Sequence, residues 1–174
     1  MNSAPSNGTT FFQVELRPIA YNLVRKGWTE DFVKSAITWY RRVMDLVREQ
    51  PNREIAVTMT VDEVWHEHML DSSAYRHDTA NVFGSYLDHF PYAGLRGEED
   101  QLRLNRIFAD TNARLAQIYG PEAVKEYLSL GRNRDPSFCS DCSGITDRPV
   151  SCSDCGGNSD GFIYQDRPMV QFNV

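Results

Sequence analysis

The sequence predicts an all-α fold: a domain of five or six helices, followed by a small irregular or β tail that binds zinc. Apolar residues recur at helical spacing through residues 11–130, the pattern of amphipathic helices that share one core. From residue 131 onward cysteine, serine, aspartate and glycine dominate, and all four cysteines lie there. We therefore divide the chain into a segment predicted to be disordered (1–10), a helical domain (11–130) and a zinc-binding tail (131–174).

The first two helices are predicted between residues 14 and 50. Apolar residues follow a helical spacing over 14–24. Pro18 lies within that stretch and is tolerated only in a first turn, so the regular helix should begin just before it. Thr29 is a good N-cap for the second helix, because its hydroxyl can accept a hydrogen bond from an unpaired N–H of the first turn. Pro51 should end that helix.

The remaining helices are predicted from cap and break signals. Thr60 is expected to cap a third helix, and its first turn then carries the acidic residues that a helix N-terminus favours. The polar run at 71–73 indicates a break and a new N-cap, so that a fourth helix should run over about 74–88. The last two helices are expected over 98–119 and 120–130.

Charge and composition exclude several classes of protein. The formal net charge is −6, which disfavours nucleic-acid binding, because that requires a basic surface that displaces counterions. No stretch approaches the roughly 20 apolar residues of a membrane span. The N-terminal residues have neither the basic nor the apolar region of a secretory signal, so we expect a cytoplasmic protein. Cysteines in that compartment are more often metal ligands than disulfides.

Two cysteine pairs in the tail predict a metal site. Each pair has the form Cys-Ser-Asp-Cys, and the four residues are Cys139, Cys142, Cys152 and Cys155. Four thiolates at this spacing can surround one tetrahedral Zn²⁺ ion at about 2.3 Å. The pairs are similar to the knuckles of zinc ribbons and of the DnaJ-type cysteine-rich domain. A structural zinc clip is the leading interpretation, and disulfides, redox-active thiols or an iron–sulfur centre are the alternatives.

All four histidines of the chain fall within residues 66–89. On a helical wheel His68 lies at the centre of an apolar face with Trp65, so both should be buried. His66 lies about 160° away, one turn after Asp62. His66 and His68 are therefore not expected to share one metal ion, since residues at i and i+2 point to different sides of a regular helix.

The next helix should bring further polar groups to this region. Asp78 and His89 are expected along one edge of it, whereas His77 should point into solvent. If the two helices pack as a hairpin, Asp78 or His89 should meet His66 or His68. Three interpretations stay open: a buried hydrogen-bonded network, a second metal site made by these residues, and metal-free acid–base catalysis.

One set of residues in this region resembles a known family. In chain order the set is Asp62, Trp65, His66, His68, Leu70, Tyr75, Asp78, Gly84 and His89. It resembles the glycine-rich domain-containing protein-like family of plants, fungi and bacteria, over residues 15–128. The chain departs from that family at Thr79, where relatives often carry cysteine, and in its tail, where two cysteine pairs replace a long glycine-rich segment. The resemblance implies a helical Trp-His-x-His module and no particular activity.

Two functions are consistent with these patterns. The leading one is a zinc-binding accessory protein that acts through contacts with another protein or a peptide. The rival is a metal-dependent enzyme that uses His66, His68, Asp78 and His89, with the tail as a lid or docking element. The enzyme needs a metal ion with a free coordination position, whereas the accessory protein needs only a buried network whose polar groups are all paired.

Overall fold

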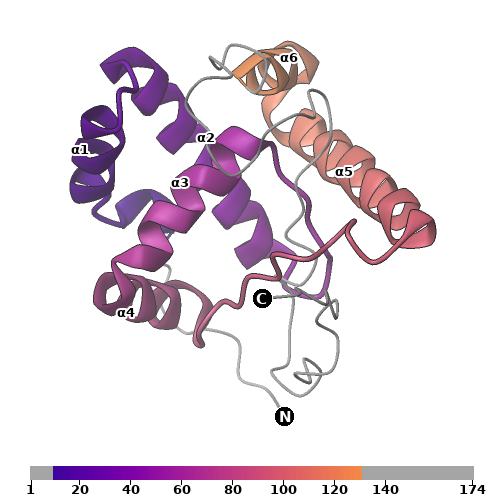
Figure 1. Ribbon diagram of the computed structural model, residues 1–174, viewed down its shortest axis with the longest axis horizontal. Coiled ribbons are helices and arrows are strands. Elements are labelled where there is room, and N and C mark those ends of the chain that lie inside the picture. The colour runs from indigo at the N-terminus through magenta and orange to yellow at the C-terminus, as the bar shows by residue number, and fades with distance from the viewer. Residues whose placement is uncertain (1–9, 131–174) are drawn as a thin grey trace, which may run out of the picture.

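The computed structural model describes residues 10–130, which form six α-helices after a short 3-10 helix (Figure 1). The elements in order are η1 (Phe11–Gln13), α1 (Arg17–Arg25), α2 (Glu30–Glu49), α3 (Met59–Leu70), α4 (Ser72–Phe83), α5 (Glu98–Tyr119) and α6 (Pro121–Leu130). This described part contains no strand, and none of its helices is both long and apolar enough to cross a membrane. The all-α prediction is confirmed here. The predicted disordered segment, apart from Thr10, and the four-cysteine tail lie outside the described residues.

Helices α2 and α3 lie in the middle of the described residues. Helix α2 contacts α1, α3 and α6, while α3 contacts α1, α2 and α4. Helices α1 and α4 lie on one side of this pair, and α5 and α6 lie on the other (Figure 1). Helix α3, which carries two of the histidines, is therefore held from several directions.

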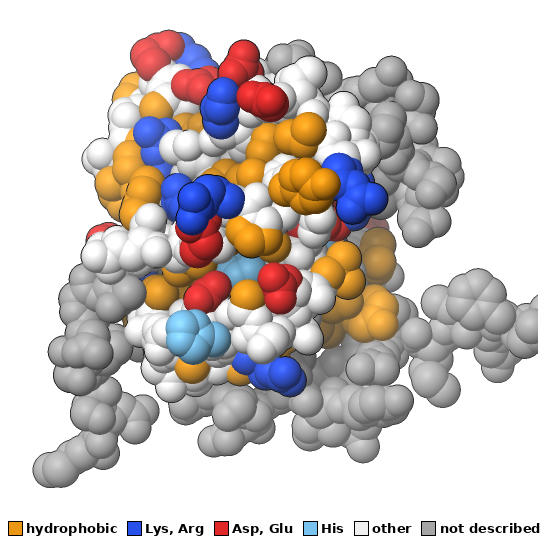
Figure 2. Space-filling view, turned by 90° about the vertical axis from the view of Figure 1, so that its left-hand side faces the viewer, with side chains coloured by type: hydrophobic (Ala, Val, Ile, Leu, Met, Phe, Trp, Pro, Cys, Tyr) orange, Lys and Arg blue, Asp and Glu red, His pale blue; other side chains and the backbone are white. Residues whose placement is uncertain are grey.

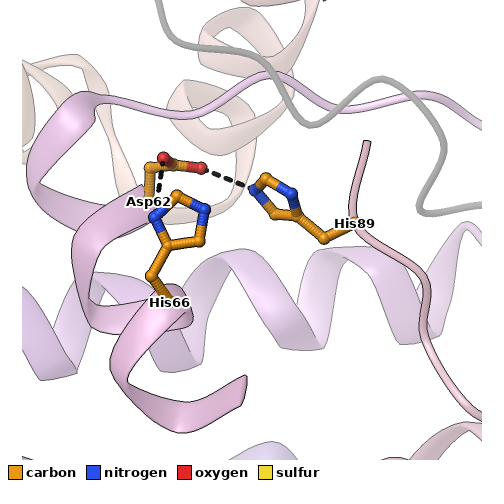
Figure 3. Close-up of side chains that lie close together, drawn as sticks. All are labelled: Asp62, His66 and His89. Carbon is orange, nitrogen blue, oxygen red and sulfur yellow. Dashed lines mark hydrogen bonds and ion pairs between the residues drawn. The ribbon is translucent and has the colours of Figure 1, made fainter. Parts of the chain in front are cut away.

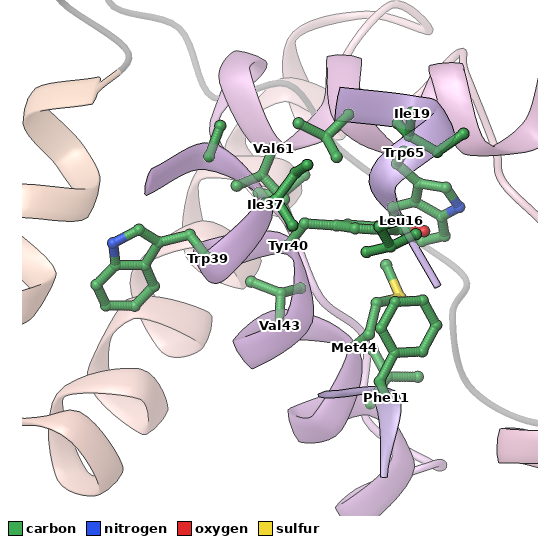
Figure 4. Packing of buried hydrophobic residues seen from close by; sticks show 14 of the residues in the cluster. Phe11, Leu16, Ile19, Ile37, Trp39, Tyr40, Val43, Met44, Val61 and Trp65 are labelled. Carbon is green, nitrogen blue, oxygen red and sulfur yellow. The ribbon is translucent and has the colours of Figure 1, made fainter. Parts of the chain in front are cut away.

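The core forms where the apolar faces of α2 and α3 meet. Ile37, Tyr40 and Met44 of α2 pack with Val61 and Trp65 of α3, and all five are buried (Figure 4). Full burial of a large apolar side chain stabilises the fold by about 1.5–3 kcal/mol. Helix α2 begins as the sequence predicts, because the Thr29 hydroxyl accepts a hydrogen bond from the N–H of Phe32 at 3.4 Å.

Helix α3 begins earlier than predicted. Its N-cap is Thr58 and not Thr60, and the backbone N–H of Thr58 donates to the Tyr127 hydroxyl of α6 at 2.8 Å. Thr60 lies in the first turn, where its hydroxyl donates to the carbonyl of Leu130 at 3.2 Å. The expected cap at Thr60 was wrong because α6, distant in sequence, supplies the partners of both threonines.

Helix α4 ends earlier than predicted. It runs only to Phe83, because Gly84 adopts a left-handed conformation with φ 79° that stops the helix. Apolar residues continue beyond this point, which is why the sequence pattern extended the helix to residue 88. His89 therefore lies in the loop between α4 and α5. The expectation that Asp78 and His89 share one helix edge is wrong for the same reason.

The contact between Tyr127 and Thr58 makes the first prediction. Tyr127→Phe leaves the buried N–H of Thr58 without an acceptor, so the free energy of unfolding should fall by about 1–3 kcal/mol. Urea denaturation would measure this loss. Tyr21→Phe is the matched control, since Tyr21 is exposed on α1 and its variant should unfold like the wild type.

The difference in stability between wild type and Tyr127→Phe should also depend on pH in the alkaline range. Burial raises the pKa of Tyr127 to about 12, above the 10.0 of an ordinary tyrosine. The folded state thus holds this proton more tightly than the unfolded chain does. The resulting stability is fully present below about pH 10 and is lost as the pH rises towards about 12. The difference in unfolding free energy between wild type and Tyr127→Phe should therefore narrow over that range, and a constant difference would contradict the assignment.

Candidate metal centre

Helix α3 places Asp62 and His66 on the same face, one turn apart. Residues at i and i+4 of an α-helix are neighbours, so both side chains point in one direction. The Nδ1 atom of His66 lies 3.5 Å from one carboxylate oxygen of Asp62. Asp62 is buried although it carries a charge, so it needs partners close by.

His89 supplies the second partner of Asp62. Its Nε2 atom lies 3.0 Å from the other carboxylate oxygen of Asp62, so that the carboxylate stands between two imidazoles (Figure 3). The rings of His66 and His89 are 4.6 Å apart between their centroids. One ligand atom from each of the three side chains lies within 4.8 Å of the other two. We call Asp62, His66 and His89 the triad.

A chain of two hydrogen bonds holds the loop that carries His89. The indole N–H of Trp65 donates to the Tyr75 hydroxyl at 2.8 Å, and that hydroxyl donates to the carbonyl of Leu87 at 2.7 Å. Leu87 precedes His89 by two residues, and the His89 ring packs edge-to-face on Trp65 with centroids 5.2 Å apart. Contacts with α3 and α4 therefore fix the position of His89, although His89 itself lies in a loop.

The donor set and spacing of the triad suit a transition-metal ion. Two imidazole nitrogens and one carboxylate oxygen are ligands that zinc accepts, and its bonds to them are about 2.0–2.2 Å. Tetrahedral ligands at those distances lie about 3.3–3.6 Å from one another. The separations of 3.0 and 3.5 Å from the two oxygens of Asp62 are close to that range. The three ligand atoms lie within 4.8 Å of one another, so small side-chain shifts would bring them around one ion. When no ion is bound, the contact of His89 with Asp62 serves as a hydrogen bond.

A second group contains the other two histidines. His68 Nδ1 lies 2.9 Å from the Tyr40 hydroxyl, and His68 Nε2 lies 3.2 Å from Asp78. Burial lowers the pKa of His68, an effect that Asp78 opposes. The neutral imidazole fits this arrangement, with Nε2–H donating to Asp78 and Nδ1 accepting from Tyr40. His77 contacts the other carboxylate oxygen of Asp78 at 3.2 Å and is exposed.

The structure thus divides the predicted site residues between two groups. His68 and Trp65 are buried and His77 is exposed, as predicted, and the expected contact of His68 with Asp78 is confirmed. However, His66 and His89 meet Asp62, which sequence reasoning placed one turn before His66 but did not include among the candidate site residues. That i,i+4 spacing was the signal that could have identified it as a candidate ligand.

Comparison of the chain with protein-family models, with curated proteins and with solved structures found no match. The predicted zinc ligands Cys139, Cys142, Cys152 and Cys155 lie outside the described residues.

The hydrogen-bond chain from Trp65 makes a third prediction. Tyr75→Phe removes both hydrogen bonds of the hydroxyl, so the loop around Leu87 and His89 should open more often. Hydrogen exchange measured by mass spectrometry should be faster in peptides that cover this loop than in wild type. Tyr21→Phe again serves as control. If the loop exchanged at the wild-type rate in Tyr75→Phe, the hydroxyl would not be what holds His89 in place.

Proposed function

We propose that this chain is a metal-binding protein that holds one zinc ion at Asp62, His66 and His89. The observation that carries the proposal is the convergence of three ligand atoms within 4.8 Å of one another, from a helix and from a loop distant in sequence. Imidazole nitrogen favours zinc and its neighbours among the transition metals, whereas magnesium and calcium prefer sites made of oxygen atoms. The mixed set of the triad therefore argues for zinc.

The tail adds a second proposed ion. Its four cysteines have the spacing of a structural zinc site, in which four protein ligands leave no open position. Such a clip would stabilise a segment too short for a hydrophobic core of its own. The two proposed sites differ in their ligands. The tail site would use four cysteine thiolates, and the triad would use one carboxylate and two imidazoles.

The proposed role of the metal-bound protein is accessory, through contacts with another protein or a peptide. Tyr21 and Val24 of α1 are exposed although they are apolar. Apolar side chains gather between Lys and Arg side chains on the face to which α1 belongs (Figure 2). Exposed aromatic residues and arginines are enriched at protein-binding surfaces. The resemblance to the glycine-rich domain-containing protein-like family is compatible with such a role and adds no activity.

The alternative is a metal-dependent enzyme whose site uses fewer of the candidate residues than the sequence indicates. His68 and Asp78 belong to the second group, where His68 is fully buried. Of the four candidates, only His66 and His89 would then act with the ion, together with Asp62. The partial exposure of His66 favours this alternative, because an enzyme must let substrate reach the metal.

Metal analysis of the full chain is the fourth prediction. Wild-type protein should retain zinc at both proposed sites after dialysis, and His66→Ala should retain one ion fewer per chain, because three ligands are reduced to two. When both proteins are compared without metal, the variant should melt within a few degrees of wild type, since His66 is half-exposed. With zinc bound, wild type should melt at the higher temperature, because an ion bound only to the folded state stabilises it. Replacement of all four cysteines by serine should leave the ion at the triad in place.

His77→Ala is the matched control for this experiment. His77 is an exposed histidine that lies outside the triad, so its removal should leave the metal content unchanged. An equal zinc content in wild type, His66→Ala and His77→Ala would refute the proposed site.

A further inference from the structure

We propose that a metal ion held by the triad keeps a coordination position that binds a small anion from solvent. This inference rests on the function proposed above and adds the class of ligand that the site takes. It also distinguishes the site from a structural clip, whose coordination is complete within the protein.

The number of protein ligands is the first argument. The group found among the described residues has three members, Asp62, His66 and His89. Structural zinc sites have four protein ligands, whereas sites with three leave the fourth position to water or to another external ligand. Two histidines with one carboxylate are a frequent ligand set of such open sites.

The uneven burial of the triad gives the open position a direction. The side chains of Asp62 and His89 are 8% and 5% exposed, whereas that of His66 is 45% exposed. Protein therefore covers the Asp62 and His89 sides of an ion. Solvent can reach it beside His66, so an external ligand would enter there.

Charge selects the kind of ligand. A divalent ion with one carboxylate and two neutral imidazoles keeps a net charge of about +1. The ion would be held on one side by the buried side chains of Asp62 and His89, so water would screen its charge poorly there. A small monoanion that donates oxygen or nitrogen completes both the charge and the coordination. Water bound at this position would become more acidic for the same reason.

The close packing around His89 favours a compact ligand. The His89 ring packs edge-to-face on Trp65 with centroids 5.2 Å apart and lies tilted against the His66 ring at 4.6 Å, so the three rings are close together. Compact anions such as hydroxide, azide or formate suit a position beside these rings. The ligand class is therefore a small anion that coordinates the metal through one atom.

Cobalt substitution tests this inference in the full-length chain. Co²⁺ takes the place of zinc and absorbs visible light in a way that changes with its ligands. We expect cobalt bound at the triad to show a saturable spectral change on titration with azide. His66→Ala keeps the cysteines of the tail, so the difference between wild type and this variant isolates the triad. His77→Ala should give the wild-type response.

The possible results of this experiment distinguish a wrong metal site from a wrong open coordination position. If wild type and His66→Ala bind the same amount of cobalt, the metal site itself is wrong and the inference falls with it. If wild type binds one additional cobalt ion whose spectrum does not change at saturating azide, the metal site stands and the open position is wrong. A response in His66→Ala equal to that of wild type would place the azide elsewhere and would also overturn the inference.

Discussion

The candidate centre depends on one hydrogen-bonded chain, from the Trp65 indole through the Tyr75 hydroxyl to the carbonyl of Leu87. Each of these groups is buried, so each needs its partner. The chain joins α3 to α4 and both helices to the loop after α4. Because Gly84 ends α4 one turn before Leu87, this contact decides where His89 goes. A loop residue thereby gains the fixed position that site residues usually receive from helices or strands.

Burial separates the histidines into two chemical classes. His68 lies between Tyr40 and Asp78 with all ring nitrogens paired, which is the geometry of a network that pins α2, α3 and α4 together. A site closed in this way has no room for substrate. In the triad, by contrast, one imidazole faces solvent. Two of the three interpretations that the sequence left open, a buried network and a metal site, thus fit different halves of the same histidine segment.

The sequence predicted best what short-range signals control. Thr29 as a cap and Pro18 in a first turn are local effects, so the starts of α1 and α2 agreed with expectation. Burial of His68 followed from helical periodicity alone. The end of α4 was missed because the apolar pattern continued beyond Gly84, and the cap of α3 was missed because Tyr127 is distant in sequence. Contacts between residues so distant in sequence cannot be predicted from residue spacing. The pairing of His89 with Asp62 is another contact of this kind.

Asp62 explains why a metal-free triad would already be arranged for an ion. A buried carboxylate without a partner costs several kcal/mol, so the fold must surround it with donors. Neutral His89 meets that need when its Nε2–H donates to Asp62, and the His66 imidazole adds a longer polar contact at 3.5 Å. A metal ion would need the lone pairs of the nitrogens that face Asp62, so a ring that carries its proton there would move it to its other nitrogen and remain neutral. The contacts with Asp62 thus compete with the ion for the nitrogens, but they also keep all three ligands in position before it arrives.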